Sequence, residues 1–433
     1  MLQWPHQAGG HAMSRRSLRM NSLTSPLLTI LALGLPAAAL PAAELLVVRG
    51  ATVHTMAGPP IIDGVIVIEA GKVRAVGPAA TTPVPPGAKE LRGAVVTPGL
   101  VDARSVVGLS GYLNQPQDQD QLDPLEAIQP ELRAIDAYNP QERLIEWLRG
   151  FGVTTIHTGH APGALVSGQT MVVKLAGTTA DAAVLAPVAM VAATLGDAAR
   201  ASGEGADKKS PGTRSKAVAM LRADLVKAQE YVRKRQLADE SKRPDRDLRL
   251  DALAHVLAGT WPLLITADRA HDIASALRLA DEFKIRIVLD SAAEAYLVSD
   301  RIKAAGVPVI VHPTMRRAGG GGETENLSFE TAATLKQAGI PIALQSGYES
   351  YVPKTRVVLF EAGLAAAHGL AFPDALAAIT IDAARIIGVA DRVGSLEVGK
   401  DADVAIFDGD PFEYTTHCTG VVIDGQVMST EAR

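Results

Sequence analysis

Strand-length apolar runs alternate with helical stretches over residues 99–395, and this alternation constrains the fold more than any other feature of the chain. We expect strands at 100–102, 153–157, 171–175, 263–266, 285–289, 307–312 and 341–345. We expect helices at 141–148, 215–235, 248–258, 270–282, 292–304, 329–337, 355–367 and 372–387. Strands that alternate with helices form a parallel sheet with helical crossovers. An α/β fold with a closed (β/α)8 TIM barrel is the natural match in size.

Both ends of the chain carry a different, β-rich pattern. Short β-branched or alternating runs separated by glycines occupy 45–76, and a similar pattern returns at 402–429 with the hairpin signal Asp424-Gly425. Neither end has enough strands to bury a core alone. We therefore predict one composite β-sandwich domain made of 44–98 and 396–433, with the barrel spanning 99–395.

The first 43 residues have the pattern of an export signal. Basic residues Arg15, Arg16 and Arg19 precede an apolar run at 27–35 and a small-residue stretch at 36–43. The apolar run is short for a membrane span, so we expect a cleaved signal peptide and no stable membrane anchor. The pair Arg15-Arg16 leaves both the general and the twin-arginine export routes open. The mature protein is expected to be periplasmic or secreted.

Composition excludes two classes of site. A formal net charge of -5 over 433 residues provides no basic patch for nucleic acid, so no nucleic-acid partner is expected. The single cysteine, Cys418, excludes an intrachain disulfide and a cysteine-based zinc site.

Two motifs resemble a known family. Pro98-Gly99-Leu100-Val101-Asp102 opens the barrel region, and Ile379-Thr380-Ile381-Asp382-Ala383-Ala384-Arg385 precedes Gly394-Ser395-Leu396-Glu397-Val398-Gly399-Lys400-Asp401-Ala402-Asp403. These segments resemble the amidohydrolase superfamily, in its imidazolonepropionase-like branch. The resemblance implies a metal-dependent hydrolase that acts on C–N bonds of non-peptide or cyclic amides.

The metal ligands that the resemblance implies are replaced in this chain. The first motif of the family continues into His-x-His, where this chain has Arg104 and Val106, and the histidine of the fifth strand falls on Thr266. Near the sixth strand only Asp290 could bind metal, and the aspartate general base of the eighth strand falls on Gly347. A guanidinium and an isopropyl group offer no lone pair to a metal ion. We therefore predict no metal at the family position.

Polar side chains at the predicted strand ends could still form a binding site at the barrel mouth. The expected site residues are Asp102, Arg104, His157, His160, Lys174, Thr266, Asp290, His312 and Glu349. Some relatives place a bridging carboxylated lysine where Lys174 stands; a plain lysine is expected here. A divalent metal relocated onto the histidines and carboxylates stays open. Arg104 could clamp a carboxylate-bearing small molecule, or pair with a nearby acid in the vacated metal volume.

Two functions remain from the residues and the resemblance. The first is an exported amidohydrolase-like enzyme that cleaves C–N bonds. The alternative is a non-catalytic relative that binds a ligand or supports an intact paralogue as a structural partner, in a homo-oligomer or a hetero-oligomer.

Overall fold

The computed structural model describes residues 45–433 except 114, 201–210, 317–321 and 349–356. The predicted signal peptide, 1–43, and the candidate site residue Glu349 therefore lie outside the described residues. Within the described part of the chain, no helix combines the length and the apolar character that a membrane span needs.

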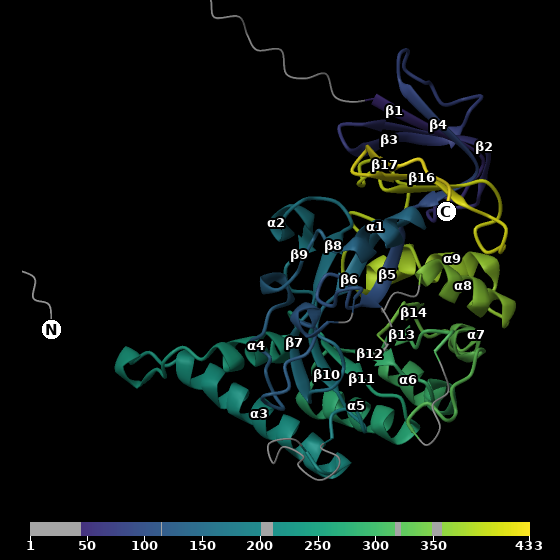
Figure 1. Ribbon diagram of the computed structural model, residues 1–433. Helices are drawn as coiled ribbons and strands as arrows, with labels where there is room; N and C mark the ends of the chain where they lie inside the picture. Colours follow the sequence, from purple (N-terminus) through teal and green to yellow (C-terminus); the bar gives the residue numbers. More distant parts are fainter. Residues whose placement is uncertain (1–44, 114, 201–210, 317–321, 349–356) are drawn as a thin grey trace, which may run out of the picture. The chain divides into compact units, whose positions relative to one another are not determined.

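Two sheets form the α/β barrel (Figure 1). One has the strand order β14-β13-β12-β11-β10-β7, and the other has the order β5-β6-β8-β9. Their bounds are β5 (Leu100–Ser105), β6 (Val153–Thr158), β7 (Val166–Gln169), β8 (Met171–Lys174), β9 (Val184–Ala186), β10 (Val191–Thr194), β11 (Leu263–Thr266), β12 (Ile287–Ser291), β13 (Val309–Val311) and β14 (Ile342–Ala343). Strands β10 to β14 are parallel neighbours, as are β5 and β6. All of these parallel strands except β10 correspond to strands that the alternating sequence pattern predicts.

Backbone hydrogen bonds join the two sheets at both junctions. Beyond β14, Ala103 N donates to Leu344 O at 3.3 Å and Gly347 N donates to Arg104 O at 3.1 Å, which attaches that edge to β5. At the other junction only Thr170 separates β7, which pairs with β10, from β8, which pairs with β6. With β7 and β8 as one stretch, the order β5, β6, β8/β7, β10, β11, β12, β13, β14 fills the positions of a (β/α)8 barrel.

The direction of the β7–β8 stretch, the third strand of the barrel, differs from the sequence prediction. The run 171–175 was expected to be an ordinary parallel strand, but β8 is antiparallel to β6 and β7 is antiparallel to β10. Only residues 159–165 connect β6 to β7, and a parallel return needs a crossover of a dozen or more residues. The chain therefore has to reverse. The parallel strand β10 was missed altogether.

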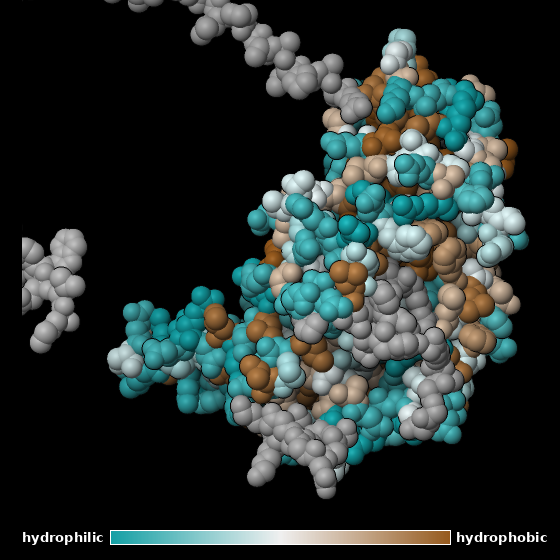
Figure 2. Space-filling model, in the orientation of Figure 1, coloured by the Kyte–Doolittle hydropathy of each residue, from teal (hydrophilic) through white to brown (hydrophobic). Residues whose placement is uncertain are grey.

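Helices surround the barrel, and one pair extends away from it. The helices are α1 (Arg143–Gly150), α2 (Ala180–Ala183), α3 (Arg214–Arg235), α4 (Leu248–Leu257), α5 (Ala270–Phe283), α6 (Ser299–Ala305), α7 (Thr331–Gln337), α8 (Val358–Ala367), α9 (Phe372–Ala378) and α10 (Ile381–Ile386). Helices α3 and α4 pack against each other and project as an arm (Figure 1). The side of the arm seen in Figure 2 is mostly hydrophilic, as expected for a solvated helix pair.

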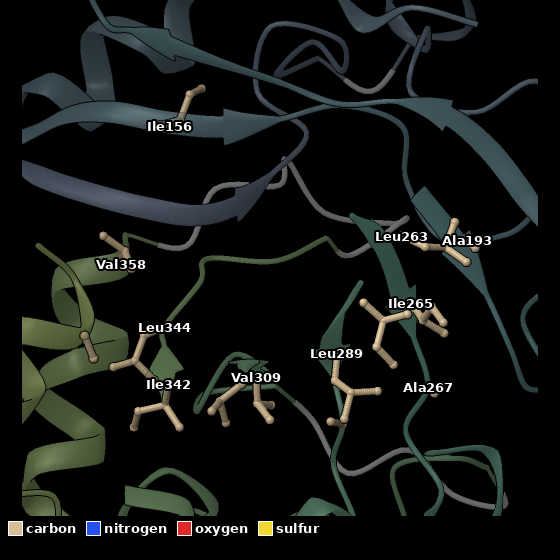
Figure 3. Close-up of a cluster of buried hydrophobic side chains, with 14 of the residues drawn as sticks. Ile156, Ala193, Leu263, Ile265, Ala267, Leu289, Val309, Ile342, Leu344 and Val358 are labelled. Atoms are coloured by element: carbon tan, nitrogen blue, oxygen red, sulfur yellow. The ribbon is translucent and has the colours of Figure 1, made fainter. Parts of the chain in front are cut away.

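Residues alternate between two cores along each barrel strand. Leu263, Ile265, Leu289 and Val309 belong to the cluster that packs beneath the helices (Figure 3). Their neighbours in sequence belong to a second cluster, which includes Val101, Val172, Leu264, Val288, Ile310 and Ala343 and is completed by residues of α10 and the loop after it. This second cluster fills the barrel interior, because successive side chains on a strand point to opposite faces.

The two ends of the chain form one sheet with the order β17-β16-β15-β4-β1-β2-β3. Its strands are β1 (Leu45–Val53), β2 (Ile61–Glu69), β3 (Lys72–Pro78), β4 (Lys89–Pro98), β15 (Val404–Phe407), β16 (Cys418–Ile423) and β17 (Gln426–Ser429). The N- and C-terminal parts meet where β4 pairs antiparallel with β15. The composite pairing is thus as predicted, but its strands are hydrogen-bonded into one continuous sheet. Only Gly99 separates β4 from β5, so the sheet leads directly into the barrel.

Candidate functional site

The polar residues of the mouth follow from the alternation along the strands. Residues two positions beyond the interior residues Leu264, Val288, Ile310 and Ala343 are Thr266, Asp290, His312 and Gln345. They share the inward direction and lie at or just past the carboxyl ends of β11 to β14, where TIM-barrel enzymes place their sites. The sequence analysis named the first three of these and missed Gln345, which stands two residues before the position it did discuss, Gly347.

Arg104 lies beside Asp290 of this group and is buried, with 3% of its surface exposed. Its Nε is 3.9 Å from Asp290 Oδ2, and its Nη2 donates to the carbonyl of His160. The pairing of β5 with β6 is irregular between Asp102 and Ser105, and such bulges re-aim side chains. Burial lowers the pKa of Arg104, while Asp290 and Asp102 oppose that shift. A guanidinium stays protonated, so the mouth contains a permanent buried cation.

The Asp290 carboxylate is fully engaged. Thr266 Oγ1 donates to its Oδ2 at 2.5 Å, and Gln345 Nε2 donates to its Oδ1 at 2.8 Å. Together with Arg104, these contacts join strands β5, β11 and β12 to the segment after β14. Of the two alternatives for Arg104, the structure therefore contains the internal ion pair.

Asp102 forms a second anchored carboxylate. Its Oδ1 accepts from the backbone N–H groups of Arg104 at 3.2 Å and Ser346 at 3.0 Å, and its Oδ2 accepts from the Ser346 hydroxyl. Burial raises the pKa of Asp102 to about 6, although these hydrogen bonds oppose the shift. Asp102 thus ties β5 to the segment after β14.

The two histidines that follow the second barrel strand have different surroundings. His157 is fully buried, with Nδ1 2.8 Å from Ala103 O and Nε2 2.6 Å from Thr170 Oγ1. These partners fit a neutral ring with Nδ1–H donating and Nε2 accepting. Burial, with a contribution from Arg104, lowers the pKa of His157 to about 3. Burial and Arg104 likewise lower the pKa of His160 to about 4, and neither of its ring nitrogens makes a well-aligned hydrogen bond to a described residue.

The two remaining described candidates, His312 and Lys174, lie at opposite ends of the barrel. His312 lies at the mouth, with Nδ1 2.9 Å from Pro313 O. Lys174, in contrast, lies at the opposite end of the barrel, because β8 is antiparallel to β6 and Lys174 pairs with Thr155 near the start of that strand. Its Nζ is 2.8 Å from Asp401 Oδ2 and 3.0 Å from Asp403 Oδ1, and it also contacts Asp424. The placement of Lys174 at the mouth was wrong; it joins the barrel to the seven-stranded sheet.

A cavity of about 380 Å³ opens beside the Arg104–Asp290 pair. Its lining combines residues of the predicted set with residues that the sequence analysis missed: Pro162, Thr194, Leu195, Ala198, Thr266, Asp268, Asp290, Ser291, Pro313, Arg316, Glu323, Thr324, Gln345, Gly347 and Tyr348. Arg104 does not line it. The charged residues of the wall that were missed are Asp268, Arg316 and Glu323, which stand in loops after β11 and β13. Asp268 follows β11 by two residues, and this position was the available signal for it.

Candidate metal donors are spread apart in the described residues. No group of three or more His, Cys, Asp or Glu side chains there has the geometry to hold a metal ion. Val106 is buried, and Gly347 adopts a φ of 73°, a backbone conformation that an aspartate would adopt only with strain.

Comparison with known proteins identifies the family. The model described as "Amidohydrolase family" matches residues 109–429. The chain belongs to the amidohydrolase family. Its barrel and sheet are similar to the crystal structure of an amidohydrolase from Thermotoga maritima MSB8, with a TM-score of 0.82, 28% identity, and coverage of 89% of this chain and 100% of that chain. Family membership supports a hydrolase-like function.

Two curated amidohydrolase relatives match shorter shares of their own length. Amidohydrolase tasK from Hapsidospora irregularis is 24% identical over 405 residues, which are 84% of this chain and 39% of tasK. An imidazolonepropionase from Symbiobacterium thermophilum is 43% identical over 82 residues, which are 19% of each protein. The chain thus spans well under half the length of these relatives in the matched regions.

Proposed function

We propose that this amidohydrolase-family chain is exported and binds a small molecule at the barrel mouth without the family's divalent metal and without metal-dependent hydrolysis. The observation that carries the proposal is the buried Arg104 guanidinium beside Asp290. A fixed positive charge at the strand ends repels a divalent cation, and it has no lone pair with which to bind one.

The oxygen and nitrogen atoms near Arg104 that could bind a metal support the same proposal. Both oxygens of Asp290 and both oxygens of Asp102 accept hydrogen bonds from protein donors. Both nitrogens of His157 have partners as well. A metal ion would have to break these bonds to bind Asp290, Asp102 or His157. The ring nitrogens of His160 make no such bond, but a single imidazole is too few ligands for a metal site, so the residues present do not fit the metal that the family implies.

Ligand binding is supported by the cavity beside the pair. Its volume of about 380 Å³ lies in the range of small-molecule pockets, and its wall mixes apolar residues with a few polar groups. Export is supported by the pattern of residues 1–43. A mature N-terminus between Leu40 and Glu44, found by mass spectrometry of the secreted protein, would support the export part; a membrane-retained form with the 27–35 run intact would contradict it.

Metal content and turnover test the binding part. The protein purified without chelators is analysed for zinc, manganese and iron, titrated with zinc chloride by calorimetry, and incubated with N-acetyl amino acids and hydantoin. We expect neither stoichiometric metal nor hydrolysis. A stoichiometric ion that is lost in Asp290→Asn or His160→Ala, together with hydrolysis that depends on it, would overturn the proposal. The second variant covers a metal relocated onto the histidines.

A further inference from the structure

Among the described residues that line the mouth cavity, Arg316 is the cationic side chain. Its Nη1 donates to Asp268 Oδ2 at 3.0 Å and to Ser291 Oγ at 2.6 Å. Asp268 is itself buried, and its Oδ1 accepts from Ser291 Oγ and from Ala293 N. The guanidinium is therefore held in place by an anchored acid and a hydroxyl at one of its terminal nitrogens.

The other edge of the Arg316 guanidinium is open. Among the described residues, no hydrogen bond or ion pair engages its Nε or Nη2, and 31% of the side chain is exposed. The Nε–Nη2 edge is the fork that binds a carboxylate with two parallel N–H···O bonds. A guanidinium that is positioned on one side and open toward a cavity on the other is pre-organised for this contact.

The acidic residues of the cavity wall do not occupy the Nε–Nη2 edge of Arg316. Asp290 has the Arg104 guanidinium beside it, and Glu323 Oε1 lies 3.4 Å from Arg214 Nη2. Asp268 is paired with Arg316. Glu323 shares the Arg214 guanidinium with Asp197 and Asp272, whereas Asp290 and Asp268 each lie beside an arginine of their own. Among the described residues of the wall, the open edge of Arg316 is the cationic donor available to an entering anion.

We propose that the ligand of this cavity carries a carboxylate and that the Nε–Nη2 edge of Arg316 holds it. This inference rests on the proposed function, since it names the chemical class bound at the same site. The rest of the ligand lies against the apolar wall of Leu195, Ala198 and Pro313. A cavity of about 380 Å³ suits a molecule the size of an acylated amino acid. The anchor is thus Arg316, and not Arg104 as the sequence suggested.

Matched probes test the carboxylate directly. The purified protein is examined by ligand-observed NMR, first with a pool of N-acetyl amino acids and then with a pool of the corresponding N-acetyl amino-acid amides. We expect acids to bind and their amides to bind at least about tenfold more weakly, because a charged hydrogen-bonded pair is lost. Arg316→Gln should weaken the binding of the acids by a similar factor. The control Arg222→Gln removes an arginine that is paired with Glu282 on the surface, and it should leave the affinity for the acids unchanged.

A second variant separates ligand binding from a merely structural pair. Asp268→Asn keeps the guanidinium of Arg316 and removes its counter-charge, so acids should bind at least as tightly as to the wild type. If Asp268 and Arg316 only stabilise the loop, both variants weaken binding equally, and the inference is wrong. It is also wrong if amides bind as well as acids, or if neither pool binds. None of these outcomes bears on metal content, which tests the proposed function separately.

Discussion

Replacing Arg104 by methionine should destabilise the protein, because it leaves the Asp290 carboxylate buried without a counter-charge. Removing one partner of a buried ion pair costs about 3–5 kcal/mol. The lower end applies here, since the charges are 3.9 Å apart and Asp290 keeps the donors Thr266 and Gln345. With about 390 folded residues the entropy of unfolding is roughly 0.8 kcal/mol per kelvin, so a loss of about 3 kcal/mol lowers Tm by about 4 °C.

A double-mutant cycle measures the pair itself. Arg104→Met and Asp290→Asn are each compared with the double variant by thermal unfolding followed by circular dichroism. Since the double variant contains neither buried charge, its loss should be smaller than the sum of the two single losses by about 2 kcal/mol, within the range of coupling energies for residues in contact. Additive losses would contradict the ion pair.

An exposed pair provides the control. Arg385 Nη1 lies 2.8 Å from Asp382 Oδ1 with 62% of the arginine side chain exposed, and Arg385→Met should cost less than about 1 kcal/mol. If Arg104→Met costs no more than Arg385→Met, Arg104 does not compensate a buried charge, and the reasoning about the metal position is refuted.

Three further predictions concern other parts of the fold. Lys174→Met should lower the free energy of unfolding by about 3 kcal/mol, because Asp403 loses its cation. The loss should be larger at pH 8 than at pH 5, since burial raises the pKa of Asp403 to about 6 and the acid is charged only above that pH. Equal losses at both pH values in chemical denaturation would contradict this. Burial lowers the pKa of His157 to about 3, so its contribution to stability is present above pH 6.5 and declines by at most about 1.4 kcal/mol per pH unit toward pH 3. His157→Gln should flatten that part of the pH profile of urea unfolding, and an unchanged slope would count against it. Gly99→Ala should lower Tm, since an added Cβ would lie 2.1 Å from Thr154 Oγ1, and Thr154→Ala should restore part of the loss; a Gly99→Ala protein as stable as the wild type would show that the contact relaxes freely.

The barrel could be predicted from sequence because its parallel strands are buried on both faces. Such strands are continuous apolar runs, as at Leu263–Thr266 and Ile287–Ser291, and their ends are marked by the first polar residues. Thr266 and Asp290 were therefore placed at the mouth correctly. The pairing of the two chain ends was predictable for a similar reason, since neither end could bury its apolar residues alone.

The cavity wall could not be predicted in the same way. Arg316 and Glu323 stand in loops, where no periodicity links a residue to a direction in space. Their roles arise from partners far away in sequence, Asp268 for Arg316 and Arg214 for Glu323. Of the wall residues that were missed, Asp268 and Gln345 had positions from which the mouth could be inferred, two residues beyond β11 and β14.

Lys174 illustrates how one local geometric fact decides a site assignment. A lysine at the end of an apolar run points to the mouth only if its strand is parallel to the others, because only then does its carboxyl end lie at the mouth. Residues 159–165 are too few for a crossover, so the run 171–174 reverses and carries Lys174 to the other end of the barrel. There its ammonium meets Asp401 and Asp403, from the loop before β15, and stabilises the contact between barrel and sheet. The predicted strands 153–157 and 171–175 leave 158–170 between them, which is long enough for a crossover, so the reversal could not be predicted without β7. Because β7 begins at Val166, the connection is too short, and this decides that Lys174 is a structural residue and not a site residue.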